Sequence, residues 1–505
     1  MTAEPIQKLV IVGGGTAGWM SASLLVKLMG ADLDITLVES DEIGTVGVGE
    51  ATIPPIQTFN NVLGLDENAF LRQTQGTFKL GIQFENWGAP GDKYMHAFGP
   101  IGRELGFSAF HHFWLRRAKQ GASDSLWDYS LNYQAAKADK FARLDHLPGS
   151  SLPGLTHAFH FDAGLYARYL RAGSEQMGVR RVEGRITQTQ LNSETGFIEA
   201  VILEDGTRLE GDLFLDCSGF RSLLMGEALQ VGYEDWTHWL PCDRAIAVPA
   251  ENGPRLRPYT QSIAHQAGWQ WRIPLQNRAG NGHVYCSDHI SEDEATAVLM
   301  NNLEGMPLAE PRTLRFTTGR RAKFWHKNCI AVGLSSGFME PLESTSIHLI
   351  QTAVVRLAQM FPTKAFDAVN EGEYNRQLGF EYERIRDFII LHYHTNQRTD
   401  SPFWTTCREM AIPESLQHKM DLFTATGRIF RENNELFTED GWLQVMIGQG
   451  LRPASYHPLA DQVPMDTLTD FMANLRGLHQ RALTDLPSHT AFIAAHCAAG
   501  QVREI

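Results

Sequence analysis

The stretch Lys8-Leu-Val-Ile-Val-Gly-Gly-Gly-Thr-Ala-Gly18 decides the fold at the start of the chain. It opens with an apolar run that predicts a buried strand, and a helical pattern, Thr16–Leu28, begins among its glycines. A second apolar run, Ile35–Glu39, predicts the next strand and ends in a carboxylate. Glycines at such a turn let the backbone approach a pyrophosphate, and an acid about twenty residues on can hold a ribose diol. The sequence therefore predicts an α/β fold with a doubly wound parallel sheet that binds a dinucleotide.

The composition indicates an ordinary globular protein. The chain has 505 residues, of which 43% are hydrophobic and 20% charged, and its net charge is −14. Because a general nucleic-acid binder needs a basic face, this balance argues against one. No apolar run reaches the roughly 18 residues that cross a bilayer, and the N-terminus has no signal-peptide pattern. We therefore expect a cytoplasmic protein without a membrane or nucleic-acid partner.

Metal-site patterns are weak throughout the chain. The six cysteines are scattered, without a Cys-x-x-Cys pair. His157 and His160 are three residues apart, but no acidic or cysteine residue accompanies them at a suitable spacing. We predict no metal site.

The nucleotide fingerprint favours FAD over NAD. A single fingerprint is evident, and it lies at the N-terminal end, as in flavoproteins of the glutathione-reductase type. Asp212–Gly219 and Cys329–Gly333 have the strand-then-small-residue character of further flavin-contacting segments. Because no second fingerprint is evident for NAD(P)H, we expect the electrons to arrive as FADH2 from a separate flavin reductase.

Hydropathy patterns suggest how the chain is divided. Phe78–Glu85 alternates apolar and polar residues as a strand does, Leu213–Asp216 and Ile330–Gly333 resemble buried strands, and helical patterns dominate after about residue 365. We expect an FAD-binding domain at 1–365, with inserted β-sheet substrate segments at about 75–160 and 225–325. A mostly helical C-terminal region, 366–505, would complete the substrate site. The oligomeric state is left open, a homodimer included.

Several segments resemble the flavin-dependent halogenases of the tryptophan-halogenase family, and the resemblance extends over most of the chain. The matching segments are Gly13–Trp19, Gly47–Pro54, Lys79, Asp216–Ser222, Trp269–Pro274 and Pro341–Thr345. The Trp-x-Trp-x-Ile-Pro segment and the lysine at its position are specific to this family among flavoproteins. The resemblance implies FADH2- and O2-dependent halogenation of a small aromatic substrate with chloride or bromide.

Lys79 and Glu343 are the implied catalytic residues. A free lysine has a pKa of about 10.4, and burial in a closed cavity lowers that pKa and exposes a nucleophilic amine. The strand pattern alone favours a solvated strand face for Lys79, and only the resemblance reverses this interpretation. The resemblance implies that Lys79 engages hypohalous acid, by hydrogen bonding or as a haloamine. It also implies that Glu343 polarises the electrophile or takes the ring proton; the alternative for Glu343 is to complement a helix dipole.

The resemblance also assigns residues to the halide and to the cofactor. The backbone amides of Thr345 and Ser346 match the halide site, which a helix N-terminus suits. Relatives commonly have glycine where Ser346 stands, which would alter that site slightly. The flavin-contacting residues implied are Gly13, Gly15, Thr16, Ala17, Gly18, Glu39, Gly49, Ala51, Leu334 and Ile347.

Four aromatic residues are implied at the substrate side. Trp269 and Trp271 lie on one face of a strand and form a wall between flavin and substrate in relatives; packing in the core is compatible with that role. His96 and Phe98 match the pair that stacks around an indole. The chain has no Tyr-Tyr pair around Gly441–Gly448 to grip an amino acid, so we expect an indole-type or other aromatic substrate instead of free tryptophan.

Two other functions are compatible with a flavin site. A flavin-dependent aromatic monooxygenase would hydroxylate the ring directly, which the tryptophan wall argues against. A non-catalytic flavin-binding protein would leave the lysine and glutamate unexplained.

Overall fold

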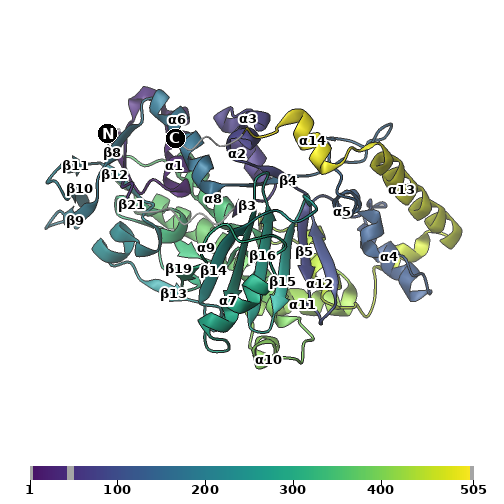
Figure 1. Ribbon diagram of the computed structural model, residues 1–505. Helices are drawn as coiled ribbons and strands as arrows, with labels where there is room; N and C mark the ends of the chain where they lie inside the picture. The colour runs from purple at the N-terminus through teal and green to yellow at the C-terminus, as the bar shows by residue number, and fades with distance from the viewer. Residues whose placement is uncertain (1–3, 43–49, 501–505) are drawn as a thin grey trace. The chain divides into compact units, whose positions relative to one another are not determined.

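The computed structural model describes residues 4–42 and 50–500, which fall into two compact units (Figure 1). The first unit comprises Met1–Gly76, Phe161–Asp243 and Arg315–Glu383. The second comprises Thr77–His160, Arg244–Leu314 and Arg384–Ile505. Each unit is therefore assembled from three separate stretches of chain. The domain assignment made from the sequence, which gives each part a function, stays a prediction.

The first unit is built on a six-stranded sheet whose order is β20-β21-β12-β1-β2-β8. The five strands from β21 to β8 are parallel, and in chain order they run 5-4-1-2-3, the order typical of dinucleotide-binding sheets. Strands of this unit are β1 (Lys8–Val12), β2 (Asp34–Glu39), β3 (Glu50–Ala51), β8 (Arg180–Glu183), β9 (Ile186–Leu191), β10 (Ile198–Leu203), β11 (Arg208–Glu210), β12 (Leu213–Asp216), β13 (Tyr233–Asp235), β19 (Gly319–Arg321), β20 (Trp325–His326), β21 (Cys329–Ala331) and β22 (Gly337–Phe338). Its α-helices are α1 (Thr16–Met29), α2 (Pro55–Leu63), α3 (Glu67–Gln73), α6 (Ala163–Gln176), α8 (Ser346–Gln359) and the first part of α9 (Ala368–His394).

Different layers cover the two faces of this sheet. Helix α1 packs against β1 and β2 and also against α6 and α8. On the other face, Val10, Val12 and Phe214 join one apolar cluster with residues of the β9-β10-β11 sheet and of the π-helix η4 (Leu223–Ala228). The α/β class is confirmed, but the second layer is a small antiparallel sheet, where a doubly wound arrangement would have helices.

The second unit is built on a seven-stranded sheet, in the order β18-β14-β17-β16-β15-β5-β6. From β14 through β17 and β16 to β15 the pairing is antiparallel, as it is between β5 and β6, whereas β15 and β5 pair in parallel. The strands of this unit are β4 (Thr77–Lys79), β5 (Gly81–Glu85), β6 (Lys93–Ala97), β7 (Ala158–Phe161), β14 (Arg244–Ala250), β15 (Thr260–His265), β16 (Gly268–Pro274), β17 (Ala279–Tyr285) and β18 (Arg312–Arg315). Besides the end of α9, its helices are α4 (Phe110–Lys119), α5 (Leu131–Lys137), α7 (Glu292–Asn301), α10 (Pro402–Glu409), α11 (Glu414–Thr426), α12 (Glu439–Gly448), α13 (Met465–Asp485) and α14 (His489–His496).

The alternating run Phe78–Glu85 forms two strands where the sequence suggested one. The chain leaves β4 at Leu80 and enters the large sheet as β5, so the two pieces pair with different neighbours. The polar positions of this run are covered as well, because Lys79 and Gly81 are buried and Gln83 is only 5% exposed. The solvated strand face considered for Lys79 is therefore wrong.

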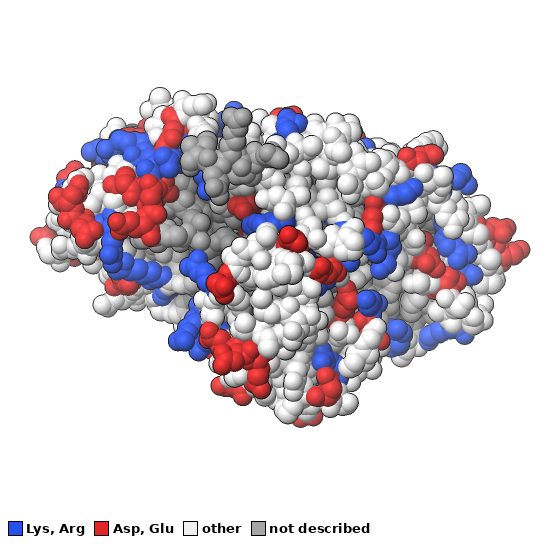
Figure 2. All heavy atoms as spheres, viewed as in Figure 1, with Lys and Arg blue, Asp and Glu red and all other residues white. Residues whose placement is uncertain are grey.

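One smaller boundary also differs from the expected one. The strand expected at Ile330–Gly333 is β21, which ends at Ala331, and Gly333 takes a positive φ of 73° in the following turn. No helix of the described residues is long and apolar enough to cross a membrane. Acidic and basic side chains are interspersed on the face shown in Figure 2.

Candidate active site

The glycine turn of the first unit is shaped by close backbone packing. Gly13 has a φ of 109°, and a Cβ there would stand 2.3 Å from the carbonyl oxygen of Cys217, which directly follows β12. A Cβ on Gly18 would stand 1.9 Å from the carbonyl oxygen of Gly13. In contrast, a Cβ on Gly15 would meet nothing within 4 Å, and Gly15 caps α1 without a side-chain hydrogen bond. The turn therefore leaves open space at the uncapped amides of a 14-residue helix, which fits a pyrophosphate.

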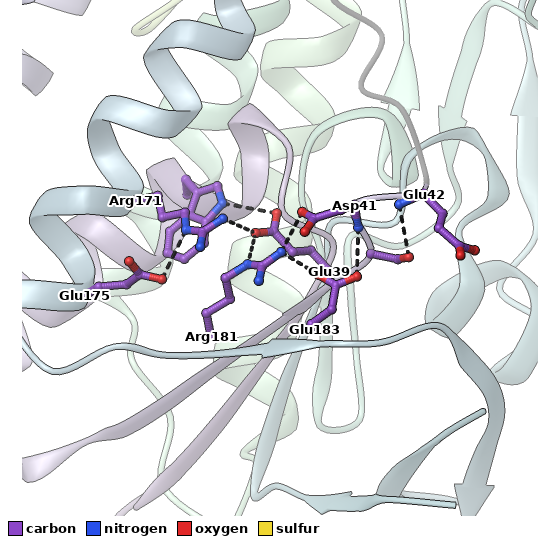
Figure 3. A network of polar contacts seen from close by, with 9 residues as sticks. Glu39, Asp41, Glu42, Arg171, Glu175, Arg181 and Glu183 are labelled. Atoms are coloured by element: carbon purple, nitrogen blue, oxygen red, sulfur yellow. Dashed lines mark hydrogen bonds and ion pairs between the residues drawn. The ribbon is translucent and has the colours of Figure 1, made fainter. Parts of the chain in front are cut away.

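Glu39 lies at the centre of an ion-pair network at the end of β2 (Figure 3). Its carboxylate accepts hydrogen bonds from Arg181 Nε, from Arg171 Nη1 at 3.3 Å and from the indole N–H of Trp19 at 3.4 Å. Arg181 also contacts Asp41 and Glu183. Burial alone would lower the pKa of its guanidinium, but Glu39 first and then these two carboxylates raise it. A Cβ on Gly14 would overlap this carboxylate, at 1.5 Å from Oε2. The arginines, which the sequence analysis missed, therefore fix Glu39 against the glycine turn.

The other predicted cofactor residues of the first unit lie around the same helix. A Cβ on Gly333, which precedes Leu334, would stand 2.8 Å from the Cβ of Ala17. Thr16 donates a 3.4 Å hydrogen bond to the carbonyl oxygen of Ala163. Ile347 is buried in α8, which packs against α1, and Ala51 is buried after a segment that includes Gly49. Gly49 itself lies outside the described residues.

The predicted halide residues begin α8. Glu343 is fully buried at the end of a single turn of 3-10 helix, and Ser344 then takes a left-handed conformation with a φ of 59°. Thr345 is the N-cap residue, but its side chain makes no capping hydrogen bond. Its hydroxyl is buried and has no hydrogen-bond partner among the described residues. An unsatisfied buried hydroxyl beside uncapped amides fits a small anion.

Lys79 is fully buried in the second unit. It is the last residue of β4, and its cross-strand neighbour is Ala158 on β7. The ammonium nitrogen lies 5.4 Å from the centroid of the Phe98 ring. Phe98 is held close by its backbone N–H, which donates to the carbonyl oxygen of Leu80 at 2.8 Å. The last residue of β4 and the residue that directly follows β6 are thus brought together.

His96 stands in an aromatic cluster on β6. Its ring centroid lies 6.5 Å from that of Phe98, 5.6 Å from that of Phe388 and 6.0 Å from that of Phe437. Phe388 and Phe437 stack on each other at 3.8 Å. The side-chain amide of Gln444 on α12 bonds both the N–H and the carbonyl of Ala97, which ties this helix to β6. The sequence indicated His96 and Phe98 but gave no spacing signal for Phe388 and Phe437.

Trp269 and Trp271 lie on one face of β16, as predicted, and are 1% and 5% exposed. Their ring centroids are 6.2 Å apart. A Cβ on Gly282, the cross-strand neighbour of Trp271, would overlap the Trp271 ring. The indole N–H of Trp271 has no acceptor among the described residues. The two rings therefore make a dense aromatic surface with one unused donor.

Among the described residues, no three His, Cys, Asp or Glu side chains gather as a metal site would require. Both ring nitrogens of His160, one of the two histidines considered, are bonded to threonine hydroxyls.

Comparisons with known proteins give the class of enzyme. The family model described as tryptophan halogenase matches residues 8–465. The tryptophan 7-halogenase RebH of Lentzea aerocolonigenes is 34% identical, covering 97% of this chain and 98% of its own. Among solved structures, the flavin-dependent halogenase Xcc4156 of Xanthomonas campestris is 50% identical with a TM-score of 0.96, covering 99% of this chain and 100% of its own. BrvH, a flavin-dependent halogenase of Brevundimonas sp. BAL3, is 47% identical with a TM-score of 0.94, covering 97% and 99%.

These matches define an oxidoreductase of the flavin-dependent halogenase class, with a flavin cofactor. The chain belongs to the tryptophan halogenase family.

Proposed function

We propose that this protein uses FADH2, O2 and chloride or bromide to halogenate an aromatic, indole-type substrate. The observation that carries the proposal is Lys79, a lysine fully buried beside the Phe98 ring. Burial favours the neutral amine, which has the lone pair needed to bind or capture an electrophilic halogen. The family membership supports the same chemistry.

The first unit would hold the cofactor as FAD in the fold of glutathione-reductase-type flavoproteins. The strand order of the sheet and the open, uncapped glycine turn support this assignment. Residues Gly13 to Gly18 would cradle the pyrophosphate, Glu39 would bind the ribose, and Leu334 and Ile347 would contact the ring system. When bound, the reduced flavin supplies, with O2, the oxidising power that converts halide to hypohalous acid. A separate flavin reductase would deliver it.

Thr345 and Ser346 would hold the halide ion. The support is the uncapped first turn of α8 together with the unpartnered, buried hydroxyl of Thr345. Because each amide dipole of this turn points its N–H outward from the helix end, a monovalent anion is stabilised there.

Lys79 would present the halogen to the substrate, either by hydrogen bonding hypohalous acid or as a haloamine. The ring carbon gains the halogen, the oxygen of hypohalous acid leaves as water, and the ring proton is lost. Glu343 would polarise the electrophile or take that proton. Trp269 and Trp271 would keep substrate and flavin apart, so that only a small oxidant passes.

His96 and Phe98 would stack around the substrate ring. The aromatic cluster of His96, Phe388 and Phe437 offers flat apolar surfaces suited to an indole. Two solved relatives with 50% and 47% identity are named only as flavin-dependent halogenases, whereas those near 30% include enzymes named for tryptophan. This agrees with a substrate other than free tryptophan.

The test is incubation with FADH2, O2, bromide and indole, followed by mass spectrometry. The wild-type protein should yield bromoindole. Lys79→Ala should reduce product to background while halide-dependent flavin oxidation continues, and Lys93→Ala, which removes a mostly exposed lysine of β6, should behave as wild type. Oxygenated indole in halide-free buffer would instead identify a monooxygenase, and full product from Lys79→Ala would exclude Lys79 from the reaction.

A further inference from the structure

A chain of buried hydrogen bonds joins four strands of the second unit. The hydroxyl of Thr77 on β4 contacts Nδ1 of His160 on β7 at 2.9 Å, and it donates to the carbonyl oxygen of Pro274 at 2.7 Å. The other ring nitrogen of His160, Nε2, contacts the hydroxyl of Thr260 on β15 at 2.9 Å. Thr77 and His160 are fully buried and Thr260 is 5% exposed. The chain of bonds therefore links β4 to the end of β16, the strand that carries Trp269 and Trp271.

The donors and acceptors along this chain can be assigned. Thr77 has a single hydroxyl proton, and the Pro274 carbonyl is an acceptor only, so that proton points to Pro274. The Thr77 oxygen then accepts from Nδ1–H of His160. Since a neutral imidazole carries one N–H, Nε2 must accept the hydroxyl proton of Thr260. His160 is thus a neutral bridge that donates on one side and accepts on the other.

The bridge lies directly beside Lys79. Thr77 and Lys79 are two residues apart on β4, so their side chains project from the same face of the strand. Burial holds the pKa of His160 well below its usual value. Between Thr77 and Lys79, the N–H of Phe78 donates to Nε2 of His489 at 3.2 Å. The lysine strand is therefore held both through the side chain of Thr77 and through the backbone of Phe78.

We propose that His160 is a positioning residue, which fixes Lys79 relative to the strand of Trp269 and Trp271 through Thr77, Thr260 and Pro274. This inference rests on the function proposed above for Lys79. Capture of a small, diffusible oxidant depends on where the amine stands when the oxidant arrives, so a loosened strand should let the oxidant escape. His160 itself touches neither substrate nor cofactor in this proposal.

The test compares His160→Phe, Thr77→Val and Thr260→Val with His283→Phe. His283 is an equally buried histidine of the same unit, on β17 of the seven-stranded sheet, and its ring is bonded to the backbone of Ala295 at 3.0 Å. Two quantities are measured: halogenated product per FADH2 oxidised, with released hypohalite trapped by a diketone dye, and the labelling rate of Lys79 by an amine reagent, read by peptide mass spectrometry. Thermal melting corrects both for differences in stability.

We expect His160→Phe to lower product per FADH2 by up to about 100-fold, since small misplacements of reacting groups cost that much. Trapped hypohalite should rise correspondingly, and Lys79 labelling should accelerate about tenfold through local opening. Thr77→Val and Thr260→Val should change the same quantities in the same direction but by less. His160→Gln should restore part of the product per FADH2, because its amide can both donate and accept a hydrogen bond. The pH profile of the remaining activity should keep its shape, because the bridge does not titrate.

Two outcomes overturn the inference. In the first, His160→Phe changes neither the product per FADH2 nor the labelling rate of Lys79. In the second, His283→Phe changes both quantities as much as His160→Phe does. The labelling rate of Lys79 distinguishes a failure of this inference from a failure of the proposed function, because it does not depend on turnover. If the wild-type protein makes neither product nor hypohalite, while Lys79 labelling still accelerates in His160→Phe alone, then the bridge positions Lys79 and the proposed function is wrong.

Discussion

The two parts of the candidate site are assembled in opposite ways. The glycine turn at Gly13–Gly18 is one continuous stretch, and its strand and helix follow each other in the chain. The surroundings of Lys79 come from Phe98, Ala158, His160 and His489, which are spread over more than four hundred positions. A contiguous site can be recognised as a motif, whereas a dispersed one exists only after long-range pairing. The predictions below test this contrast, from the largest expected effect to the smallest.

Gly13→Ala should have the largest effect, because the contiguous turn has no room for a side chain at this position. The added Cβ would clash with the Cys217 carbonyl and strain a φ of 109°. We expect a loss of about 3 kcal/mol in the free energy of unfolding and loss of FAD binding. Gly64→Ala is the matched control, since Gly64 caps α2 in the left-handed conformation with a φ of 77°, and the nearest atom to a Cβ there, Lys27 Nζ, is 3.9 Å away. It should cost only about 1 kcal/mol, measured by urea unfolding, and equal losses in both variants would contradict the steric argument.

His489 should give the dispersed region a pH-dependent stability. Burial lowers its pKa to about 4 in the folded protein, whereas an unfolded histidine titrates near 6.5. Because the unfolded state binds the extra proton, stability is complete above about pH 6.5 and falls by about 1.4 kcal/mol per pH unit toward pH 4.

In His489→Gln, the free energy of unfolding should depend less steeply on pH, by about 1.4 kcal/mol per pH unit. The measurement is denaturant unfolding between about pH 6.5 and 4.5. The buried His283 and His479, also with pKa values of about 4, keep the remaining slope in the variant. An unchanged slope would mean that His489 is not a neutral anchor of the lysine strand.

Gly441→Ala tests the aromatic cluster without removing any of its members. The new Cβ on α12 would stand 3.0 Å from Nε2 of His96 and push on its ring, while alanine favours the helix by about 0.5–1 kcal/mol. We expect KM for indole to rise about fivefold with no loss of stability, and His96→Ala to raise KM about tenfold. A KM unchanged in both variants would remove His96 from the substrate site.

Arg181→Met should have the smallest effect. It removes the guanidinium that holds Glu39 while leaving a side chain of similar length, and we expect the Kd for FAD to rise about threefold, measured by fluorescence quenching. Glu175→Gln, which touches the network only through Arg171, should leave the Kd unchanged. A lower Kd for FAD in Arg181→Met would show instead that Arg181 competes with the ribose for Glu39.

How far the sequence could predict the site follows from this contrast. Strand β1, helix α1 and strand β2 were placed within one residue at each end, because apolar periodicity and glycines act locally. The alternating run around Lys79 predicted one strand with a solvated face, and this prediction was wrong. Alternation of apolar and polar residues does not tell whether both faces of a strand are covered. His160 could be recognised only as a histidine of uncertain role, and no spacing pointed to His489 or Arg181.

The sequence by itself determined the parallel α/β beginning, the glycine turn with its acid, and membership in a halogenase family, since each depends on residues close together in the chain. Only the tertiary structure decided that Lys79 is buried, that Arg171 and Arg181 hold Glu39, and that a neutral histidine joins Thr77 beside the lysine to Thr260 on β15. Burial and hydrogen-bond direction depend on which distant segments meet. That information appears only when the strands have paired.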